Sequence, residues 1–177
     1  MTKQLLRQAL LDLAEEKPVS EIGVTELCRR AGINRTTFYN HYGNPVDVLS
    51  DIEQEAYGKI SRQLNELADK GELSLAKRVE TICTYLRAHE RTAKVLFARS
   101  ESPSEFAMSL FELPLGWERQ RRRLHERLDA ETRSLMITYL THGTYSLVRK
   151  WLLEDMEKTP EQMGKLAEDV ALNGWAR

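Results

Sequence analysis

Apolar residues recur at helical spacing along most of the chain. Between residues 3 and 16, for example, Leu6, Leu10 and Leu13 fall on one face of a helix, which Pro18 then ends. The same spacing, interrupted by glycine, proline or capping residues, predicts a helix in each of these ranges: 3–16, 25–31, 35–41, 45–68, 74–89, 91–98, 103–113, 116–128, 130–156 and 160–173. The expected fold class is therefore all-α.

Short polar residues stand where several of these helices begin. The candidate N-caps are Thr25, Asn34, Asn44, Ser74, Asp129 and Thr159. The sequence TPEQ at 159–162 also forms a capping box, with proline at the first helical position. Gly32 follows the helix 25–31 at a place where helix ends favour a left-handed backbone. These signals locate helix boundaries more closely than the apolar pattern does.

Composition agrees with a core-forming protein that has no membrane anchor. The 177 residues are 41% hydrophobic and 30% charged, and no apolar stretch approaches the roughly 20 residues that span a bilayer. The N-terminal segment contains acids and is unlike a signal peptide. Cys28 and Cys83 lack metal-ligand spacing and are expected to be buried thiols. We therefore expect a cytoplasmic protein with no metal and no other cofactor.

The net charge of −1 does not by itself indicate nucleic-acid binding, because six cations balance six acids in residues 1–50. Residues 24–49, VTELCRRAGINRTTFYNHYGNPVDVL, give a more specific signal. Two short helices joined by a glycine turn, with apolar residues such as Leu27 and Phe38 between them, are typical of a helix-turn-helix. The second helix would present hydrogen-bonding side chains that suit a major groove: Arg35, Thr36, Thr37, Tyr39, Asn40 and His41. From these residues alone, a solvent-facing helical turn in an ordinary all-α protein is the alternative.

Residues 3–52 resemble the DNA-binding domain of TetR-family regulators. The matching residues are Thr25, AGI at 31–33, TFYNHY at 37–42 and VL at 48–49. The resemblance implies that Thr25 caps its helix and contacts a phosphate, while Phe38 and Tyr42 belong to the core. The residues implied at the major groove are Arg35, Thr36, Tyr39 and Asn40, and those implied at phosphates are Thr37 and His41. Because a guanidinium can bind guanine O6 and N7 together, Arg35 is the best candidate for a base contact.

One position departs from the family pattern. Pro45 stands where many members carry a lysine that meets the DNA backbone. Its presence is expected to reduce the salt dependence of binding by about one phosphate contact. The backbone amides of Gly43 and Asn44, at the start of the helix 45–68, are candidates to bind that phosphate instead.

Residues 51–177 are expected to form a helical dimerisation and regulatory domain that follows a helix-turn-helix domain of residues 1–50. The resemblance implies that the helices 130–156 and 160–173 pair with their counterparts in a homodimer. These helices offer more apolar surface than a small monomer easily buries: Leu135, Tyr139, Tyr145, Leu147, Trp151, Leu152, Met163, Leu166 and Val170. Gly143 in mid-helix costs about 1 kcal/mol relative to alanine, which favours a close backbone approach there. The stretch THGTYSLVRKWL at 141–152 also resembles regulators of dihydroxyacetone kinase operons.

The resemblance further implies a small-molecule effector in this domain. Candidate pocket residues are Tyr85, His89, Phe97, Phe106, Phe111, Trp117 and His142, and core packing is the alternative for each. An arginine-rich run comprises Arg119, Arg121, Arg122, Arg123, Arg127 and Arg133. Interspersed acids favour a solvated, salt-bridged face for this run over a second nucleic-acid surface or an anion-responsive site.

The sequence thus predicts a DNA-binding transcriptional regulator: a repressor that binds a palindromic site on double-stranded DNA as a homodimer and is released by a ligand. No catalytic residues are predicted, since the sequence has no G-x-S-x-G, P-loop or H-E-x-x-H pattern. The alternative is a helical adaptor or co-activator that keeps the helix-turn-helix fold and acts mainly through protein partners.

Overall fold

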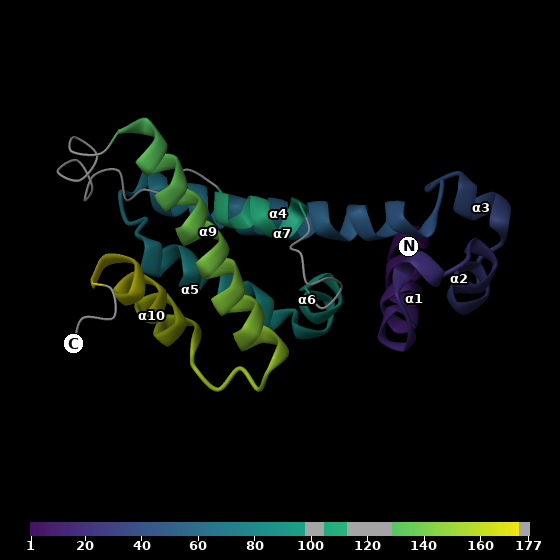
Figure 1. Ribbon diagram of the computed structural model, residues 1–177. Helices are drawn as coiled ribbons and strands as arrows, with labels where there is room; N and C mark the ends of the chain where they lie inside the picture. Colours follow the sequence, from purple (N-terminus) through teal and green to yellow (C-terminus); the bar gives the residue numbers. More distant parts are fainter. Residues whose placement is uncertain (98–104, 113–128, 174–177) are drawn as a thin grey trace. The chain divides into compact units, whose positions relative to one another are not determined.

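The computed structural model of the chain describes residues 1–97, 105–112 and 129–173 (Figure 1). Every regular element in those ranges is a helix, so the predicted all-α fold class is confirmed. The chain divides into two compact units, Met1–Tyr57 and Gly58–Arg177, with the boundary inside a long helix. No helix in the described part of the chain is both long enough and apolar enough to cross a membrane.

The first unit is a small helical domain with a leucine-rich core. Its elements are α1 (Thr2–Glu16), a 3-10 turn η1 (Val19–Glu21), α2 (Val24–Ala31), α3 (Arg35–Tyr39) and the first half of α4 (Pro45–Asp69). Leu6 and Leu10 on α1 and Leu27 on α2 are completely buried where these two helices pack together. Each such side chain contributes about 1.5–3 kcal/mol by its burial.

A network of ion pairs and hydrogen bonds links α1 to α4 within this unit. The Asp51 carboxylate accepts hydrogen bonds from Arg7 Nε at 2.8 Å and from the Tyr42 hydroxyl at 2.6 Å, and Arg7 also pairs with Glu55. Burial acts to raise the pKa of Asp51, but the bonds from Tyr42 and Arg7 outweigh it and the pKa is lowered. Tyr42, which follows α3, is thereby attached to α4 and, through Asp51, to α1.

The second unit contains the rest of α4 and a group of shorter helices. These are α5 (Leu75–Ala88), α6 (Glu90–Phe97), α7 (Glu105–Glu112), α9 (Ala130–Leu153) and α10 (Pro160–Asn173). α10 lies along α5 (Figure 1). A Cβ atom on Gly164 of α10 would stand 2.3 Å from the carbonyl oxygen of Ala76 on α5, so a side chain at this position would prevent the contact.

Most predicted helix starts are confirmed, because the predicted side chain accepts a hydrogen bond from a nearby backbone amide. These bonds are Asn34 Oδ1 with Thr37 N (2.8 Å), Asn44 Oδ1 with Val46 N (2.8 Å), Ser74 Oγ with Lys77 N (3.1 Å), Asp129 Oδ1 with Thr132 N (2.8 Å) and Thr159 Oγ1 with Gln162 N (3.2 Å). The predicted cap at Thr25 is wrong. α2 begins at Val24 with Gly23 as its N-cap, and its first helical bond already runs from Leu27 N to Gly23 O at 3.0 Å.

Two helices end two or more residues earlier than the sequence predicts. α3 ends at Tyr39 instead of residue 41, and α9 ends at Leu153 instead of residue 156. Met156 has a left-handed backbone with φ of 45°, which an α-helix cannot pass through. Arg87 donates to the carbonyl oxygens of Met156 and Lys158 and so holds the α9–α10 loop in place. The predicted helix 116–128 lies outside the described residues.

Candidate nucleic-acid interface

The turn between α2 and α3 positions α3, the candidate recognition helix. Gly32 has φ of 67° and ψ of 31°, the left-handed conformation that glycine adopts without strain. The amide of Ile33 then donates to Cys28 O at 3.0 Å, which closes the end of α2. Asn34 caps the next helix two residues later, so α3 begins at Arg35.

One face of α3 anchors the helix in the core. Phe38 is completely buried, and its ring meets the ring of Tyr39 edge-on at a centroid distance of 5.4 Å. Tyr42 is 6% exposed, with its ring 6.1 Å from that of Phe38. Both Phe38 and Tyr42 are therefore packing residues, as the sequence predicts.

The other face of α3 is polar and open to solvent. Arg35, Thr36, Tyr39, Asn40 and His41 are exposed, and Thr37 is half-buried. Tyr39 is 58% exposed, although it touches Phe38. The structure therefore brings the predicted DNA-contacting residues together on one surface, and their contact with DNA stays a prediction.

Two of the predicted contact residues also bind each other. The Arg35 guanidinium donates a hydrogen bond to the hydroxyl oxygen of Thr25, across the turn between α2 and α3. This bond uses one of the five N–H donors of the guanidinium. It therefore orients Arg35 without occupying the whole group.

Intramolecular ion pairs neutralise most cations of the first unit. The pairs are Lys3–Asp51 (3.4 Å), Arg7–Asp51 (2.6 Å), Lys17–Glu26 (2.6 Å) and Arg30–Glu16 (2.8 Å). In the described structure, Arg29 and Arg35 are the cations of this unit that form no ion pair, and both are exposed. Sequence reasoning missed Arg29 as a candidate phosphate contact, because nothing in the run Cys28-Arg29-Arg30 shows which arginine a carboxylate on α1 will neutralise.

The start of α4 offers no free amide at Gly43 or Asn44. Asp47 Oδ2 accepts hydrogen bonds from the amides of Gly43 at 2.7 Å and Asn44 at 3.0 Å. The expectation that these amides bind a phosphate in place of a lysine at position 45 is therefore wrong, since the chain's own carboxylate occupies them. A phosphate would have to displace Asp47 and would be repelled by its charge.

The residues predicted at a dimer interface divide into two groups. Those buried within one protomer, each at most 6% exposed, are Tyr145, Trp151, Leu152 and Met163. Their prediction as contacts between protomers is corrected, because their side chains already pack against their own chain. The residues left at the surface are Leu135, Tyr139 and Val170, which are 65%, 70% and 37% exposed, and Leu147 and Leu166, which are half-buried.

Two of the predicted effector contacts belong to an aromatic cluster. Phe97 and Phe111 are buried, and their ring centroids lie 5.9 Å and 6.0 Å from that of Tyr145. Burial acts to raise the pKa of Tyr145, and this effect dominates. The cluster fills space between α6, α7 and α9, which is the core packing that the sequence left as an alternative.

The other candidates do not meet in a common pocket within the described structure. Tyr85 contacts His89 at a centroid distance of 4.4 Å, with His89 exposed. Phe106 is half-buried, and His142 is exposed on α9. Trp117 and the side chains of the arginine-rich run lie outside the described residues. Among the residues that are described, no group of His, Cys, Asp or Glu side chains is arranged to hold a metal ion.

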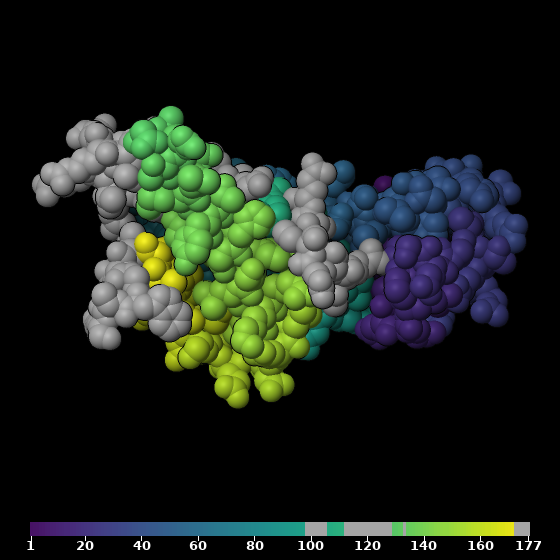
Figure 2. Space-filling model, in the orientation of Figure 1, coloured from purple at the N-terminus to yellow at the C-terminus, as the bar shows by residue number. Residues whose placement is uncertain are grey.

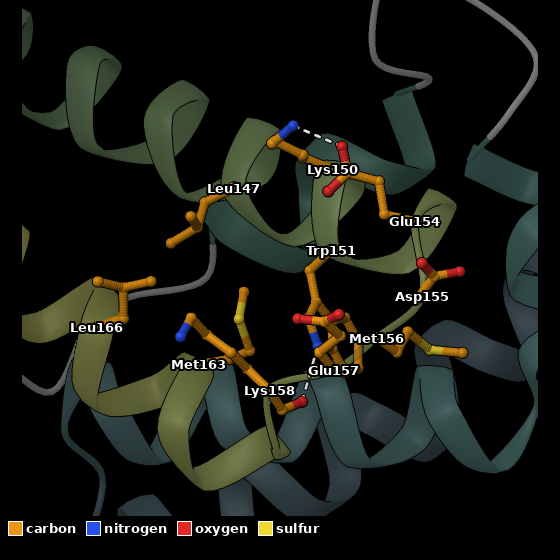
Figure 3. Close-up of a pocket in the computed structure, with 10 residues that line it drawn as sticks. All are labelled: Leu147, Lys150, Trp151, Glu154, Asp155, Met156, Glu157, Lys158, Met163 and Leu166. Atoms are coloured by element: carbon orange, nitrogen blue, oxygen red, sulfur yellow. Dashed lines mark hydrogen bonds and ion pairs between the residues drawn. The ribbon is translucent and has the colours of Figure 1, made fainter.

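A hollow opens instead between the C-terminal end of α9 and the start of α10 (Figure 3). It has a volume of about 330 Å³. Leu147 of α9 and Leu166 of α10 point toward one another across it, and Trp151 and Met163 lie deeper. The indole Nε1 of Trp151 donates to Lys158 O at 2.9 Å, which attaches the loop to this wall. The hollow thus has an apolar lining with charged residues at its rim.

Comparisons with known proteins agree with this picture. A TetR-type family model described as "Transcriptional regulator C-terminal region" matches residues 74–173, more than half of the chain. The HTH-type transcriptional regulator YxbF of Bacillus subtilis is 30% identical over 101 residues, which are 56% of this chain and 27% of that protein. An HTH-type transcriptional regulator of Haemophilus influenzae is 26% identical over 111 residues, 58% of this chain and 54% of that protein. The chain thus covers less than two thirds of either relative.

Solved structures with the same fold cover nearly the whole chain. The fatty acid degradation regulator FadR from Bacillus halodurans has a TM-score of 0.67 at 14% identity, covering 99% of this chain and 97% of that one. The dihydroxyacetone kinase operon activator DhaS has a TM-score of 0.61 at 17% identity, covering 98% and 95%. Thermus thermophilus FadR in complex with lauroyl-CoA has a TM-score of 0.54 at 18% identity, covering 99% and 95%. With the family model matched over residues 74–173 and a helix-turn-helix at its N-terminal end, this chain belongs to the TetR family of transcriptional regulators.

Proposed function

We propose that this chain is a cytoplasmic, sequence-specific DNA-binding repressor. Residues 1–50 are the DNA-binding domain, and residues 51–177 are the dimerisation and regulatory domain. The observation that carries this proposal is the two-sided α3, with Phe38 completely buried and polar side chains exposed on the other face. A helix anchored in this way can enter a major groove without losing its own packing.

Each exposed residue has a distinct role in this proposal. Arg35, Thr36, Tyr39 and Asn40 contact base edges, while Thr25, Thr37 and His41 contact phosphates. Arg29 adds a phosphate contact, because it is exposed and its charge is not neutralised by an ion pair in the described structure. Two such phosphate-contacting cations per dimer would give binding a clear dependence on salt.

The chain acts as a homodimer on a palindromic operator. A twofold dimer places two copies of α3 in successive major grooves about 34 Å apart. The exposed Leu135, Tyr139 and Val170 on α9 and α10 support self-association, since such apolar surface is otherwise unfavourable in water.

A small-molecule effector bound in the second domain shifts α4 and lowers the affinity for DNA. The lauroyl-CoA complex of Thermus thermophilus FadR supports an effector for a protein of this fold. Such a response requires the effector to bind the protein more tightly when α4 is in one position than when it is in the other. An adaptor that acts through protein partners is the second candidate, and the Asp47 carboxylate at the start of α4 favours it by repelling phosphate.

Footprinting on the DNA that flanks the protein's own gene tests the proposal. We expect one protected palindrome with two half-sites about one helical turn apart. Genome-wide binding in cells extends the search if that region is not protected. The absence of any protected palindrome in both experiments would favour the adaptor.

A further inference from the structure

A row of residues along α9 changes from protruding to recessed. Its members, spaced four residues apart on one ridge of the helix, are Leu135, Tyr139, Gly143, Leu147 and Trp151. The exposed fraction is 65% at Leu135 and 70% at Tyr139, but only 6% at Trp151. The first half of the row therefore projects from the surface, and the second half borders the hollow between α9 and α10 (Figure 3).

Gly143 lies at the centre of this row. It is exposed, and apart from its own helix backbone and chain neighbours, a Cβ atom built on it would have no atom of the described protomer within 4 Å. Glycine inside a helix is less favourable than alanine. The missing side chain therefore serves no packing purpose within the described chain and leaves room for another backbone.

On α9, the part of the row from Leu135 to Leu147 lies in a stretch without charged residues, whereas charged residues stand at the rim of the hollow beside Trp151. Residues 134–148 include no Asp, Glu, Lys or Arg, although these make up 30% of the chain. The exposed polar residues beside the row are uncharged or histidine: Ser134, Thr138, His142 and Ser146. Interface cores are depleted of charge and enriched in tyrosine, whereas a permanently solvated helix face in so charged a chain would carry several ions.

The apolar surface continues from α9 onto α10. Leu166 faces Leu147 across the hollow, and Val170 follows one turn later with 37% of its surface exposed. Figure 2 shows the surfaces of α9 and α10 adjoining in the second unit. A partner that fits here should be uncharged opposite residues 135–147, carry a projecting side chain that enters the hollow and approach closely at Gly143.

A second copy of this chain meets all three requirements. In a twofold contact both protomers use the same surface, and where the two copies of α9 run antiparallel, residues equally far before and after the axis face each other. With the axis beside Gly143, the protruding Tyr139 of each protomer lies opposite the partner's Leu147. The surface is then its own complement, with a projection four residues before the axis and a hollow four residues after it.

We propose that the two protomers cross at Gly143 and that Tyr139 of each fills the hollow beside Leu147 and Leu166 of the other. Packing of one four-residue ridge against its copy gives a crossing angle of about 50°. This inference rests on the homodimer proposed above and adds its register and the occupant of the hollow.

Disulfide trapping in the full chain tests the register. Under mild oxidation, the double variant Tyr139→Cys with Leu147→Cys is expected to form a covalent dimer on a non-reducing gel. The matched control is Tyr139→Cys with Ser134→Cys, which places an exposed second thiol on the same helix, away from the hollow and out of register. The native Cys28 and Cys83 are buried and should add little background.

A pair of glycine substitutions tests the crossing point. Gly143→Ala is expected to raise the dimer dissociation constant by about tenfold or more, because added groups in a close contact force the helices apart. Gly58→Ala is the matched control, since Gly58 is also exposed in a helix with no atom of the described chain within 4 Å of an added Cβ. Sedimentation equilibrium should find its dissociation constant unchanged.

The outcomes separate this inference from the proposed homodimer. A dimer that cross-links through residues 139 and 147, and is weakened by Gly143→Ala alone, supports the register. If the chain is a dimer but the control pair cross-links as well, or Gly143→Ala dimerises as tightly as Gly58→Ala, the register is overturned and the homodimer stands. A wild-type monomer at micromolar concentration overturns both.

Discussion

Arg35 begins α3 with its guanidinium already oriented by the Thr25 hydroxyl. Less side-chain freedom is then lost when it binds a base, which favours a specific contact. We expect Arg35→Ala to weaken binding to the cognate site by about 1–3 kcal/mol and to relax the preference at one base pair. Competition binding with operators altered at single positions measures both effects.

Arg29 provides the matched comparison for that experiment. It is also an exposed arginine without an ion pair in the described structure, but it lies on α2 and not on the recognition helix. Arg29→Ala should weaken binding equally on all sequences and lower the salt dependence by about one contact per protomer. If Arg35→Ala gives this same uniform loss, Arg35 contacts phosphate and not a base.

We expect Asp47 to oppose DNA binding at the start of α4, because its carboxylate occupies the amides of Gly43 and Asn44. Asp47→Ala would free both donors and remove a negative charge beside them. We expect several-fold tighter binding to DNA of any sequence, together with a loss of about 1 kcal/mol in stability from the missing cap. Fluorescence anisotropy and urea unfolding measure the two effects.

The control for Asp47 is Glu21→Ala, which removes the same charge from an exposed position in the turn η1. It should change DNA affinity much less, since Glu21 accepts no hydrogen bond from the start of α4 in the described structure. Equal gains from both variants would show that net charge, and not the freed amides, governs binding.

Among the helices, the contact between α5 and α10 depends on one glycine. Gly164→Ala would bring a Cβ atom to 2.3 Å from Ala76 O, a backbone atom that cannot rotate away as a side chain would. We expect a loss of about 1–3 kcal/mol in the free energy of unfolding. Urea unfolding measures this loss. Gly58→Ala is the control, and it should instead raise the free energy of unfolding by up to about 1 kcal/mol. A neutral Gly164→Ala would show that α10 can shift without cost.

The α1–α4 network predicts how stability depends on pH. The pKa of Asp51 is lowered in the folded chain from its ordinary value of 3.8, so its ion pairs stabilise the fold above that pH and are lost as pH falls through the lowered value. Burial, followed by the bond to Asp51, raises the pKa of Tyr42 from 10.0 to about 12, so its contribution is present below pH 10 and is lost as pH rises toward 12.

Urea unfolding from pH 2 to 5 and from pH 9 to 12 tests these two dependences. Asp51→Asn should make the free energy of unfolding depend less on pH in the acid range than it does in the wild type. Tyr42→Phe should do the same in the alkaline range. A stronger pH dependence of the free energy of unfolding in these variants would contradict the proposed roles of Asp51 and Tyr42.

Local chemistry accounts for what the sequence predicts well at the level of helices. Asn34, Ser74 and Asp129 cap their helices through bonds to amides three residues away, so no distant part of the chain is needed. Local sequence does not, by contrast, distinguish the structural roles of Gly143 and Gly164. Both are helical glycines in the sequence, but only Gly164 meets another backbone within the described chain, and this depends on how α10 packs on α5.

At the scale of the whole molecule, too, the sequence does not show which surfaces pack against each other. Periodicity shows that α9 and α10 are apolar, but it does not show which of their faces the same chain covers. Tyr145, Trp151 and Met163 are buried within the protomer, while Leu135 and Tyr139 on the same apolar pattern are exposed. The candidate recognition face was predictable because its motif is local. The ion pair of Arg30 with Glu16, by contrast, depends on how α1 packs against α2, and sequence alone does not show that Arg30 and not Arg29 forms it.

Dimerisation and operator binding should be coupled through Tyr139. A palindromic site gains affinity because the second α3 binds at high effective concentration once the first has bound. Tyr139→Asp would place a charge in the apolar hollow and separate the protomers, so we expect about a hundredfold weaker binding to the full palindrome. Binding to a single half-site should not change, because α3 lies in the other unit. Thr84→Asp is the control, since it adds the same charge at an exposed position on α5, outside the proposed contact, and should preserve both affinities. Anisotropy with the two DNA lengths separates the cases, and an equal loss on the half-site would show that Tyr139 supports the fold and not the pairing of protomers.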